Sequence, residues 1–288
     1  MMIKNILKLL RVEQYTKNFF IFAPLFFSFQ FHLINFFSVA QAFILFSLMA
    51  SSIYILNDIF DIEEDKLHPD KKMRPLANNS IKIKHAWYYC LVLISVSLLW
   101  SYMVNIQIFL ILLIYLIINI LYSVKLKQIP IIDVIVIATG FVLRLFVGGY
   151  AIDEMITMWI IVLTFILSLF IALAKRKEDM QLLVDGKETR KSVGFYDLNI
   201  LNISLKFLSV LIVIIYFLFT LSPDAIIKFH DNIFITTIFV ILGLYRYLYL
   251  TLIKHYSGDP TKIFLTDKAL QVIITSWLVT FYYIARIL

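Results

Sequence analysis

The sequence has few of the residues on which a water-soluble domain relies. Only 16% of its 288 residues are charged and 61% are hydrophobic, whereas an ordinary soluble domain is about 25% charged and about 45–50% apolar. One soluble core cannot bury so large an apolar surplus, which excludes an ordinary soluble fold. Cys90 is the single cysteine, so no disulfide forms within the chain and nothing indicates an oxidising compartment.

The N-terminus also lacks the pattern of a secretory signal peptide. Arg11, Glu13 and Lys17 follow the first apolar residues without a small-residue cleavage site. The apolar residues of this segment recur on one helical face, and the basic residues lie elsewhere around it. We therefore expect a short interfacial helix over about 2–12 that rests on an anionic leaflet.

Long apolar runs, by contrast, are abundant. A helix needs about 20 apolar residues to cross a bilayer core, and nine segments have this character. They lie near residues 19–33, 39–59, 85–103, 108–122, 131–151, 157–174, 201–221, 233–253 and 269–287. We predict an all-α integral membrane protein of nine transmembrane helices that forms a single domain over residues 1–288.

Basic residues alternate between the segments that join these spans. Of the 26 Lys and Arg residues, 21 fall at the N-terminus or in every second loop. Because such an excess marks the cytoplasmic side, we expect a multi-pass protein of the inner (plasma) membrane with its N-terminus in the cytoplasm and its C-terminus outside. The net charge of +7 then reflects topology rather than nucleic-acid binding. Two long cytoplasmic loops, about 60–84 and 175–200, are the expected functional segments.

Acidic residues gather where the second predicted span ends. Asn57, Asp61 and Asp65 are spaced i, i+4, i+8, and Asp58 precedes Asp61 by three, so a continuing helix places them on one stripe. Such carboxylates repel one another unless a cation lies among them, and oxygen ligands suit Mg²⁺. A solvated acidic helix end is the alternative. We predict that Mg²⁺ binds to Asn57, Asp58, Asp61 and Asp65.

Basic residues follow the acidic ones in the same loop. A diphosphate needs such cations beside its metal, although a basic run alone mostly marks an inner loop. Asn-Asp-x-x-Asp-x-x-x-Asp, followed by His-Pro-x-Lys-x-x-Arg-Pro over 68–75, resembles the first Asp-rich motif of the UbiA superfamily of intramembrane prenyltransferases. The resemblance implies a nine-helix bundle whose central cavity opens to the cytoplasm, with Mg²⁺ holding a diphosphate at its mouth.

The segment after the sixth span departs from the usual pattern of that superfamily. Typical members carry a second Asp-rich motif there, whereas this chain has Ala174-Lys175-Arg176-Lys177-Glu178-Asp179. A basic patch at a membrane edge suits a lipid phosphate, although Glu178 and Asp179 leave a second metal open. Segments such as Phe141-x-x-Arg144-x-x-x-Gly148-Gly149 and Arg11-x-x-Gln14-Tyr15-x-Lys17-Asn18 resemble the decaprenyl-phosphate phosphoribosyltransferase branch, which often has Pro where this chain has Val12.

That branch implies Mg²⁺-dependent transfer of 5-phosphoribosyl from phosphoribosyl diphosphate to a polyprenyl (decaprenyl-like) phosphate, with release of diphosphate. The expected catalytic residues are Asp58, Asp61, Lys71 and Arg74. The expected substrate-binding residues are Lys17, Asn57, Tyr122, Lys127, Asp133, Arg144, Lys175 and Arg176. Among these residues, Lys71, Arg74 and Lys127 are expected to hold the oxygens of the donor. Lys17, Lys175 and Arg176 are expected to steer the lipid phosphate.

Arg144 lies deep in a predicted span, eleven residues after Asp133 and on the same helix face, about 16 Å further along the axis. An intramembrane Arg is costly unless it faces the bundle interior, and Gly140 and Gly148 flank it at i±4, which indicates a close helix contact or a cavity. We place Asp133 and Tyr122 at the rim of the site and leave Arg144 as structural or site-supporting.

Two other functions remain open. A UbiA-type prenyltransferase would move a prenyl group from prenyl diphosphate to an aromatic or lipid acceptor, and Glu178, Asp179 and Asp185 would support that chemistry. A transporter would place its ionisable residues near the midplane of the membrane. Here these residues cluster at one surface, which favours an enzyme.

Overall fold

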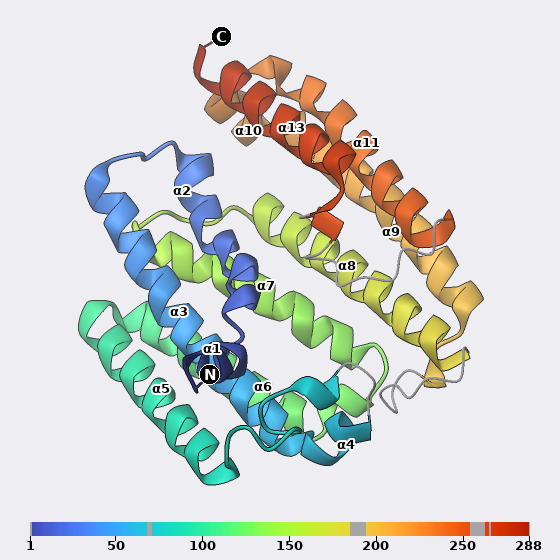
Figure 1. Ribbon diagram of the computed structural model, residues 1–288. Coiled ribbons are helices and arrows are strands. Elements are labelled where there is room, and N and C mark those ends of the chain that lie inside the picture. Colours follow the sequence, from blue (N-terminus) through green and yellow to red (C-terminus); the bar gives the residue numbers. More distant parts are fainter. Residues whose placement is uncertain (1, 68–70, 185–193, 254–262, 265, 288) are drawn as a thin grey trace. The chain divides into compact units, whose positions relative to one another are not determined.

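The computed structural model of the chain describes residues 2–67, 71–184, 194–253, 263–264 and 266–287 (Figure 1). The described residues form helices, turns and loops, without strands. The chain divides into two compact units, the first made of Met1–Thr157 with Leu182–Ser192 and the second of Met158–Gln181 with Val193–Leu288. The two units are described in turn.

The described residues between 2 and 151 of the first unit form ten helical segments. They are α1 (Met2–Leu10), η1 (Val12–Phe22), α2 (Ala23–Ser28), α3 (Leu33–Phe60), α4 (Ile62–Leu67), η2 (Lys71–Met73), α5 (Ile83–Val104), α6 (Ile106–Val124), η3 (Leu126–Gln128) and α7 (Ile132–Ala151), where η marks a 3₁₀ helix. Helix α3 is at the centre, because it packs against α5, α6, α7 and η1. Its Leu45, Phe46 and Met49 are fully buried. Helix α5, by contrast, exposes apolar residues such as Leu91 and Leu99, as a lipid-facing helix does.

The described residues of the second unit form α8 (Met158–Val184, of which Leu182–Val184 are assigned to the first unit), α9 (Leu198–Thr220), α10 (Pro223–Phe229), η5 (Asp231–Thr236), α11 (Thr237–Leu248), η6 (Tyr249–Ile253, a short π-helix) and α13 (Lys268–Ile287). Phe170, Leu205, Leu244 and Leu270 come from α8, α9, α11 and α13 and meet in its core. The prediction of a loop from residue 175 is wrong, because α8 continues to Val184. The charged residues after 174 end the apolar run, but they do not end the helix.

Eight helical segments in the described part of the chain are long and apolar enough to cross a membrane, and they correspond to eight of the nine predicted spans. The protein is therefore a multi-pass, all-α membrane protein. The predicted span 19–33 is instead built from the end of η1, the short α2 and a turn at Phe29, whose φ is 56°. Pro24 lacks an N–H donor and lies in the first turn of α2, so a new helix begins there. A ninth span remains a prediction.

Helix η1 lies along α3 in a regular ladder of polar contacts. The Tyr15 and Ser51 hydroxyls are 2.8 Å apart, and the Asn18 side-chain amide donates to Ser47 Oγ at 2.9 Å. Three residues of a 3₁₀ helix and four residues of an α-helix both advance about 6 Å. The steps from Tyr15 to Asn18 and from Ser51 to Ser47 therefore match in length.

Gly148 allows η1 to approach α7 closely. A Cβ atom at this position would lie 2.0 Å from the Ile21 carbonyl oxygen, so any side chain would force the two helices apart. Helix η1 is therefore held against α7 as well as against α3.

Helix α1 confirms the predicted N-terminal helix, although it ends at Leu10 rather than near residue 12. Its Leu9 is fully buried in a cluster with Ile55 and Ile62, while Ile3 and Leu7 are exposed. The segment is thus anchored to the end of α3 and offers an apolar face, which suits the predicted interfacial position.

Candidate active site

The site lies where α3 gives way to α4. Helix α3 ends at Phe60, Asp61 caps it with φ −99° and ψ 8°, and α4 begins at Ile62. The Asp61 N–H still donates to the Asn57 carbonyl at 3.0 Å, and the Asp65 N–H donates to the Asp61 carbonyl at 2.8 Å. Because these i+4 bonds continue across the break, the predicted acidic stripe persists although the helix itself is interrupted.

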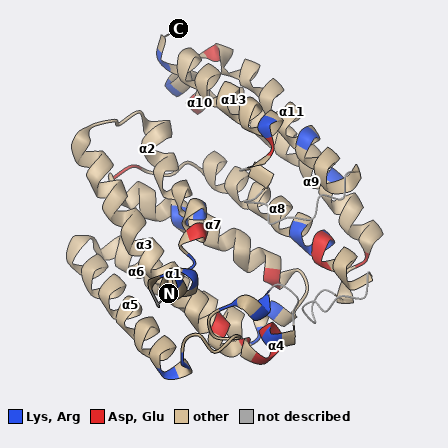
Figure 2. Cartoon of the chain, in the orientation of Figure 1, with Lys and Arg blue, Asp and Glu red and all other residues tan. Residues whose placement is uncertain are grey.

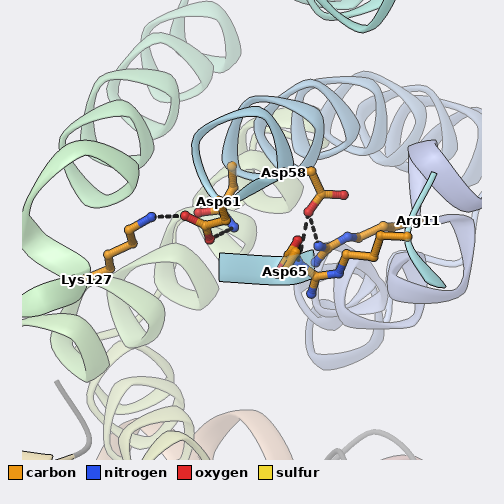
Figure 3. A network of polar contacts seen from close by, with 7 residues as sticks. Arg11, Asp58, Asp61, Asp65 and Lys127 are labelled. Carbon is orange, nitrogen blue, oxygen red and sulfur yellow. Dashed lines mark hydrogen bonds and ion pairs between the residues drawn. The ribbon is translucent and has the colours of Figure 1, made fainter. Parts of the chain in front are cut away.

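Two arginines converge on the first acidic residue of the stripe. Asp58 is 2% exposed, and its Oδ1 forms ion pairs with Arg11 and with Arg74, the latter at 3.1 Å. Arg74 Nη1 also donates to Asp65 Oδ2 at 2.6 Å, so one guanidinium bridges two carboxylates. Figure 3 shows Arg11 meeting Asp58 beside Asp65.

Asp61 has a separate set of partners. The Lys127 ammonium, from η3, forms an ion pair with its Oδ1, and the Asn57 amide donates to its Oδ2 at 3.1 Å. Lys127 therefore meets the acidic stripe from the side opposite Arg11 (Figure 3). The structure thus brings six of the predicted residues together in two sets of contacts, one around Asp61 and one around Asp58 and Asp65: Asn57, Asp58, Asp61, Asp65, Arg74 and Lys127.

The network is balanced in charge. We call it the acidic network: three buried aspartates, paired with three basic side chains from outside the stripe (Asp58, Asp61 and Asp65 with Arg11, Arg74 and Lys127). Burial, followed by the neighbouring charge of Arg11, lowers the pKa of Arg74, although an Arg remains protonated at neutral pH. Within the first unit, many of the charged residues gather around α4 and the start of the chain (Figure 2).

The oxygen atoms of the network suit a hard cation. Asn57 Oδ1 is buried and has no hydrogen-bond partner, and such an orphaned acceptor is costly unless a ligand satisfies it. Asp58 and Asp65 each use one oxygen in the pairs above, which leaves the second to other ligands. In the described residues no three acidic, His or Cys side chains converge closely enough to form a metal site by themselves. Mg²⁺, which takes one or two carboxylates together with substrate oxygens, fits this donor set.

Arg144 lies apart from the acidic network and is 4% exposed. Its Nε donates to Asn18 Oδ1 at 2.8 Å, and its Nη1 donates to the Gly140 carbonyl at 2.7 Å. The guanidinium also lies 4.7 Å from the centre of the Phe46 ring and 5.0 Å from that of Phe141. These contacts join α7 to η1.

The other predicted residues of the first unit come from separate elements. Lys17 is half-buried on η1, Lys71 begins η2, Tyr122 is half-buried near the end of α6, and Asp133 is fully buried in the first turn of α7. His68, in the basic motif, and Asp185, in the prenyltransferase alternative, lie outside the described residues.

The basic segment of the second unit is not a uniform patch of cations. Arg176 is 2% exposed and donates to Asp179 at 2.6 Å. Lys177 is buried and donates to the Thr251 carbonyl at 2.7 Å, whereas Lys175 is half-buried. One carboxylate oxygen of Asp179 is thus taken by Arg176.

Arg11 is the network residue that sequence reasoning did not assign to the site. The segment that contains it, Arg-x-x-Gln-Tyr-x-Lys-Asn, is one of those that resemble the family. This resemblance is the signal that could have pointed to Arg11. However, its partner Asp58 lies 47 residues further along the chain, and no local pattern connects the two.

Comparison with known proteins agrees with this architecture. A decaprenyl-phosphate phosphoribosyltransferase from Mycolicibacterium smegmatis is 29% identical over 250 residues, which cover 84% of this chain and 78% of that protein. One from Corynebacterium glutamicum is 28% identical over 284 residues, covering 95% and 84%. A UbiA homolog from Archaeoglobus fulgidus, solved with GPP and Mg²⁺, superposes with a TM-score of 0.71 at 20% identity and covers 98% of this chain and 99% of that one.

The fold likeness and the sequence matches concern the same stretch of chain. Residues 19–270 match the profile of the UbiA prenyltransferase family, and this range includes α3, the acidic stripe and the basic segment of α8. The chain therefore belongs to the UbiA prenyltransferase family and is a membrane-embedded transferase.

Proposed function

We propose that this protein transfers 5-phosphoribosyl from phosphoribosyl diphosphate to a polyprenyl phosphate, with Mg²⁺ as its cofactor. The observation that carries the proposal is the pairing of Arg176 with Asp179. Three basic residues, Lys175, Arg176 and Lys177, stand where a prenyl-diphosphate enzyme of the family would carry a second Asp-rich motif, and Asp179 beside them is paired with Arg176. The relatives named decaprenyl-phosphate phosphoribosyltransferase, which match most of the chain, support the same substrates.

The acidic network would bind the diphosphate of the donor. Asn57, Asp58, Asp61 and Asp65 would hold Mg²⁺, which when bound neutralises the negative charge of the departing diphosphate. Arg74 would donate to diphosphate oxygens while it remains anchored on Asp65. Lys71 and Lys127 would bind the remaining oxygens or the 5-phosphate of the sugar.

The transfer itself needs little proton chemistry. An oxygen of the lipid phosphate forms a bond with the anomeric carbon of the ribose, and the bond between that carbon and the diphosphate oxygen breaks with its electron pair. Because the attacking oxygen is already anionic at neutral pH, no general base is required. The network residues contribute by fixing the diphosphate and stabilising its growing charge.

The lipid phosphate would be steered by Lys17 of η1 and by Lys175 and Arg176 of α8. Lys175 is the stronger candidate of the two on α8, because Arg176 is buried and already paired. Tyr122, Asp133 and Arg144 would line or support the donor site, which we place on the cytoplasmic side of the membrane, with the N-terminus on the same side. The whole chain would act as one domain, with a cavity open to the cytoplasm.

Incubation with competing donors tests the proposal. Purified protein in detergent receives decaprenyl phosphate with either phosphoribosyl diphosphate or geranylgeranyl diphosphate, with Mg²⁺ or with a chelator, and lipid products are identified by mass spectrometry. We expect a phosphoribosylated lipid only with the first donor and only with Mg²⁺. Because the protein requires no membrane gradient in this assay, turnover also excludes transport as the primary activity.

The second candidate is transfer of a prenyl group to an aromatic or lipid acceptor. The match of residues 19–270 to the UbiA prenyltransferase family favours it. In the same assay, with a phenolic acceptor added, conversion of the prenyl donor alone would establish this activity and refute the phosphoribosyl proposal.

A further inference from the structure

Arg11 occupies a special place in the chain. It is the single residue between α1 and η1, and its backbone is left-handed, with φ 50° and ψ 49°. Side-chain-bearing residues adopt this conformation at a cost, and strained residues of this kind concentrate at functional sites. The turn directs the Arg11 side chain to the buried Asp58, so the fold maintains the strain together with a specific ion pair.

Arg11 and Arg74 differ in the partners that each would keep if the Asp58 carboxylate bound a metal. Arg74 would keep its 2.6 Å contact with Asp65 if Asp58 turned to a metal. Arg11 pairs with Asp58 and with no other carboxylate in the described residues. Its guanidinium also lies 5.1 Å from the centre of the Tyr54 ring, and this cation–π contact would still hold the side chain near the site.

The charge balance of the acidic network bears on metal binding. Three aspartates and three basic side chains leave no net charge. A divalent cation alone must then compete with Arg and Lys for the same oxygens and adds two positive charges to a buried place. A diphosphate that arrives with the metal removes this excess.

We propose that Arg11 is an exchangeable counter-ion of the site. It neutralises Asp58 while no metal is bound. When Mg²⁺ binds to the Asp58 carboxylate, the Arg11 guanidinium moves to an oxygen of the diphosphate. The exchange rests on the proposed function for the metal and the diphosphate, but not on the sugar. It makes the binding of Mg²⁺ and of diphosphate cooperative, because each removes the obstacle to the other.

Titration with Mn²⁺, followed by electron paramagnetic resonance, tests the first half of the exchange without any substrate. The variant Arg11→Gln leaves the network with one uncompensated carboxylate, so we expect it to bind Mn²⁺ alone about tenfold more tightly than the unmodified protein. Lys66→Gln is the matched control: it removes the same charge nearby, but Lys66 pairs with the exposed Glu63 outside the network. Binding by Arg11→Gln that is equal to or weaker than that of the unmodified chain would overturn the proposal.

Inorganic diphosphate in the same titration tests the second half. We expect diphosphate to tighten Mn²⁺ binding strongly in the unmodified protein and in Lys66→Gln, but much less in Arg11→Gln. An equal gain in all three proteins would show that Arg11 does not move to the diphosphate. Neither titration contains phosphoribosyl diphosphate or measures turnover, so the exchange and the proposed function fail independently.

A chemical measurement on the unmodified chain covers the case in which Arg11→Gln does not fold. Phenylglyoxal reacts with accessible arginines, and mass spectrometry reports the extent of reaction at each one. We expect Mg²⁺ at high concentration to raise the reactivity of Arg11, and added inorganic diphosphate to lower it again. Reactivity that does not respond to Mg²⁺ would refute the exchange.

Discussion

The acidic network of the first unit and the basic segment of the second unit pair their charges in different ways. In the network, Arg11 reaches Asp58 across 47 residues and Lys127 reaches Asp61 across 66. In the basic segment, Arg176 pairs with Asp179 only three residues away. Long-range pairs of buried charges exist only once the tertiary fold has assembled, and each is costly if one partner is missing. On this ground we propose that the first region holds the reacting groups and the second an accessory segment.

Removing one carboxylate from each region gives the sharpest contrast. Asp58→Asn keeps the size of the side chain but removes a carboxylate ligand of the proposed metal and the ion-pair partner of Arg11. We therefore expect kcat to fall by more than about a hundredfold. Asp179→Asn leaves the buried Arg176 without its carboxylate but removes no proposed metal ligand, so we expect kcat to fall by less than about tenfold. Steady-state assays with phosphoribosyl diphosphate measure both. Equal losses in the two variants would erase the distinction between the regions.

Adding one methyl group to a glycine in each unit tests the close contact between η1 and α7. Gly148→Ala brings a Cβ to 2.0 Å from the Ile21 carbonyl, so we expect η1 to shift and stability to fall by about 3 kcal/mol. Gly243→Ala meets its nearest neighbour, Ile273 Cγ2, at 3.7 Å, and it gains helix propensity worth about 1 kcal/mol. Thermal unfolding in detergent compares them, and a Gly148→Ala protein as stable as Gly243→Ala would contradict the close approach of η1 and α7.

Changing Lys175 should have the smallest effect. Since Lys175 is proposed to steer the lipid phosphate, Lys175→Ala should raise the apparent KM for the lipid about fivefold and leave the KM for phosphoribosyl diphosphate unchanged. Lys228→Ala, on α10 at the side predicted to face outward, removes the same charge and serves as the control. An effect confined to the sugar donor would reverse the assignment of the two subsites.

Eight spans could be predicted from the sequence because a bilayer-length apolar run is a local signal. The stripe from Asn57 to Asp65 could be predicted for a similar reason, since i+4 spacing survives the break at Asp61. The extension of α8 to Val184 was missed because helical backbone continues beyond the apolar run that revealed it. The position of Arg11 could not be predicted, because it depends on a left-handed turn and on packing between distant segments.

The first predicted span shows a different limit. A hydropathy window detects apolar length but not the pitch of the helix, so it does not distinguish a 3₁₀ helix from an α-helix. The pattern Tyr15, Asn18, Ile21, in which every third residue contacts α3 or α7, is the signal that could have revealed η1. Recognising it requires knowing which neighbours those residues meet.

The matched ladder between η1 and α3 limits how this segment can change in length. One residue inserted between Tyr15 and Asn18 would rotate every later side chain of η1 by about 120°. Asn18 would then leave both Ser47 and Arg144, and the backbone of a residue other than Ile21 would lie against Gly148. Substitutions along η1 can be absorbed one at a time, whereas an insertion or deletion displaces all of its contacts together. Alignment gaps in related chains should therefore fall outside residues 12–22.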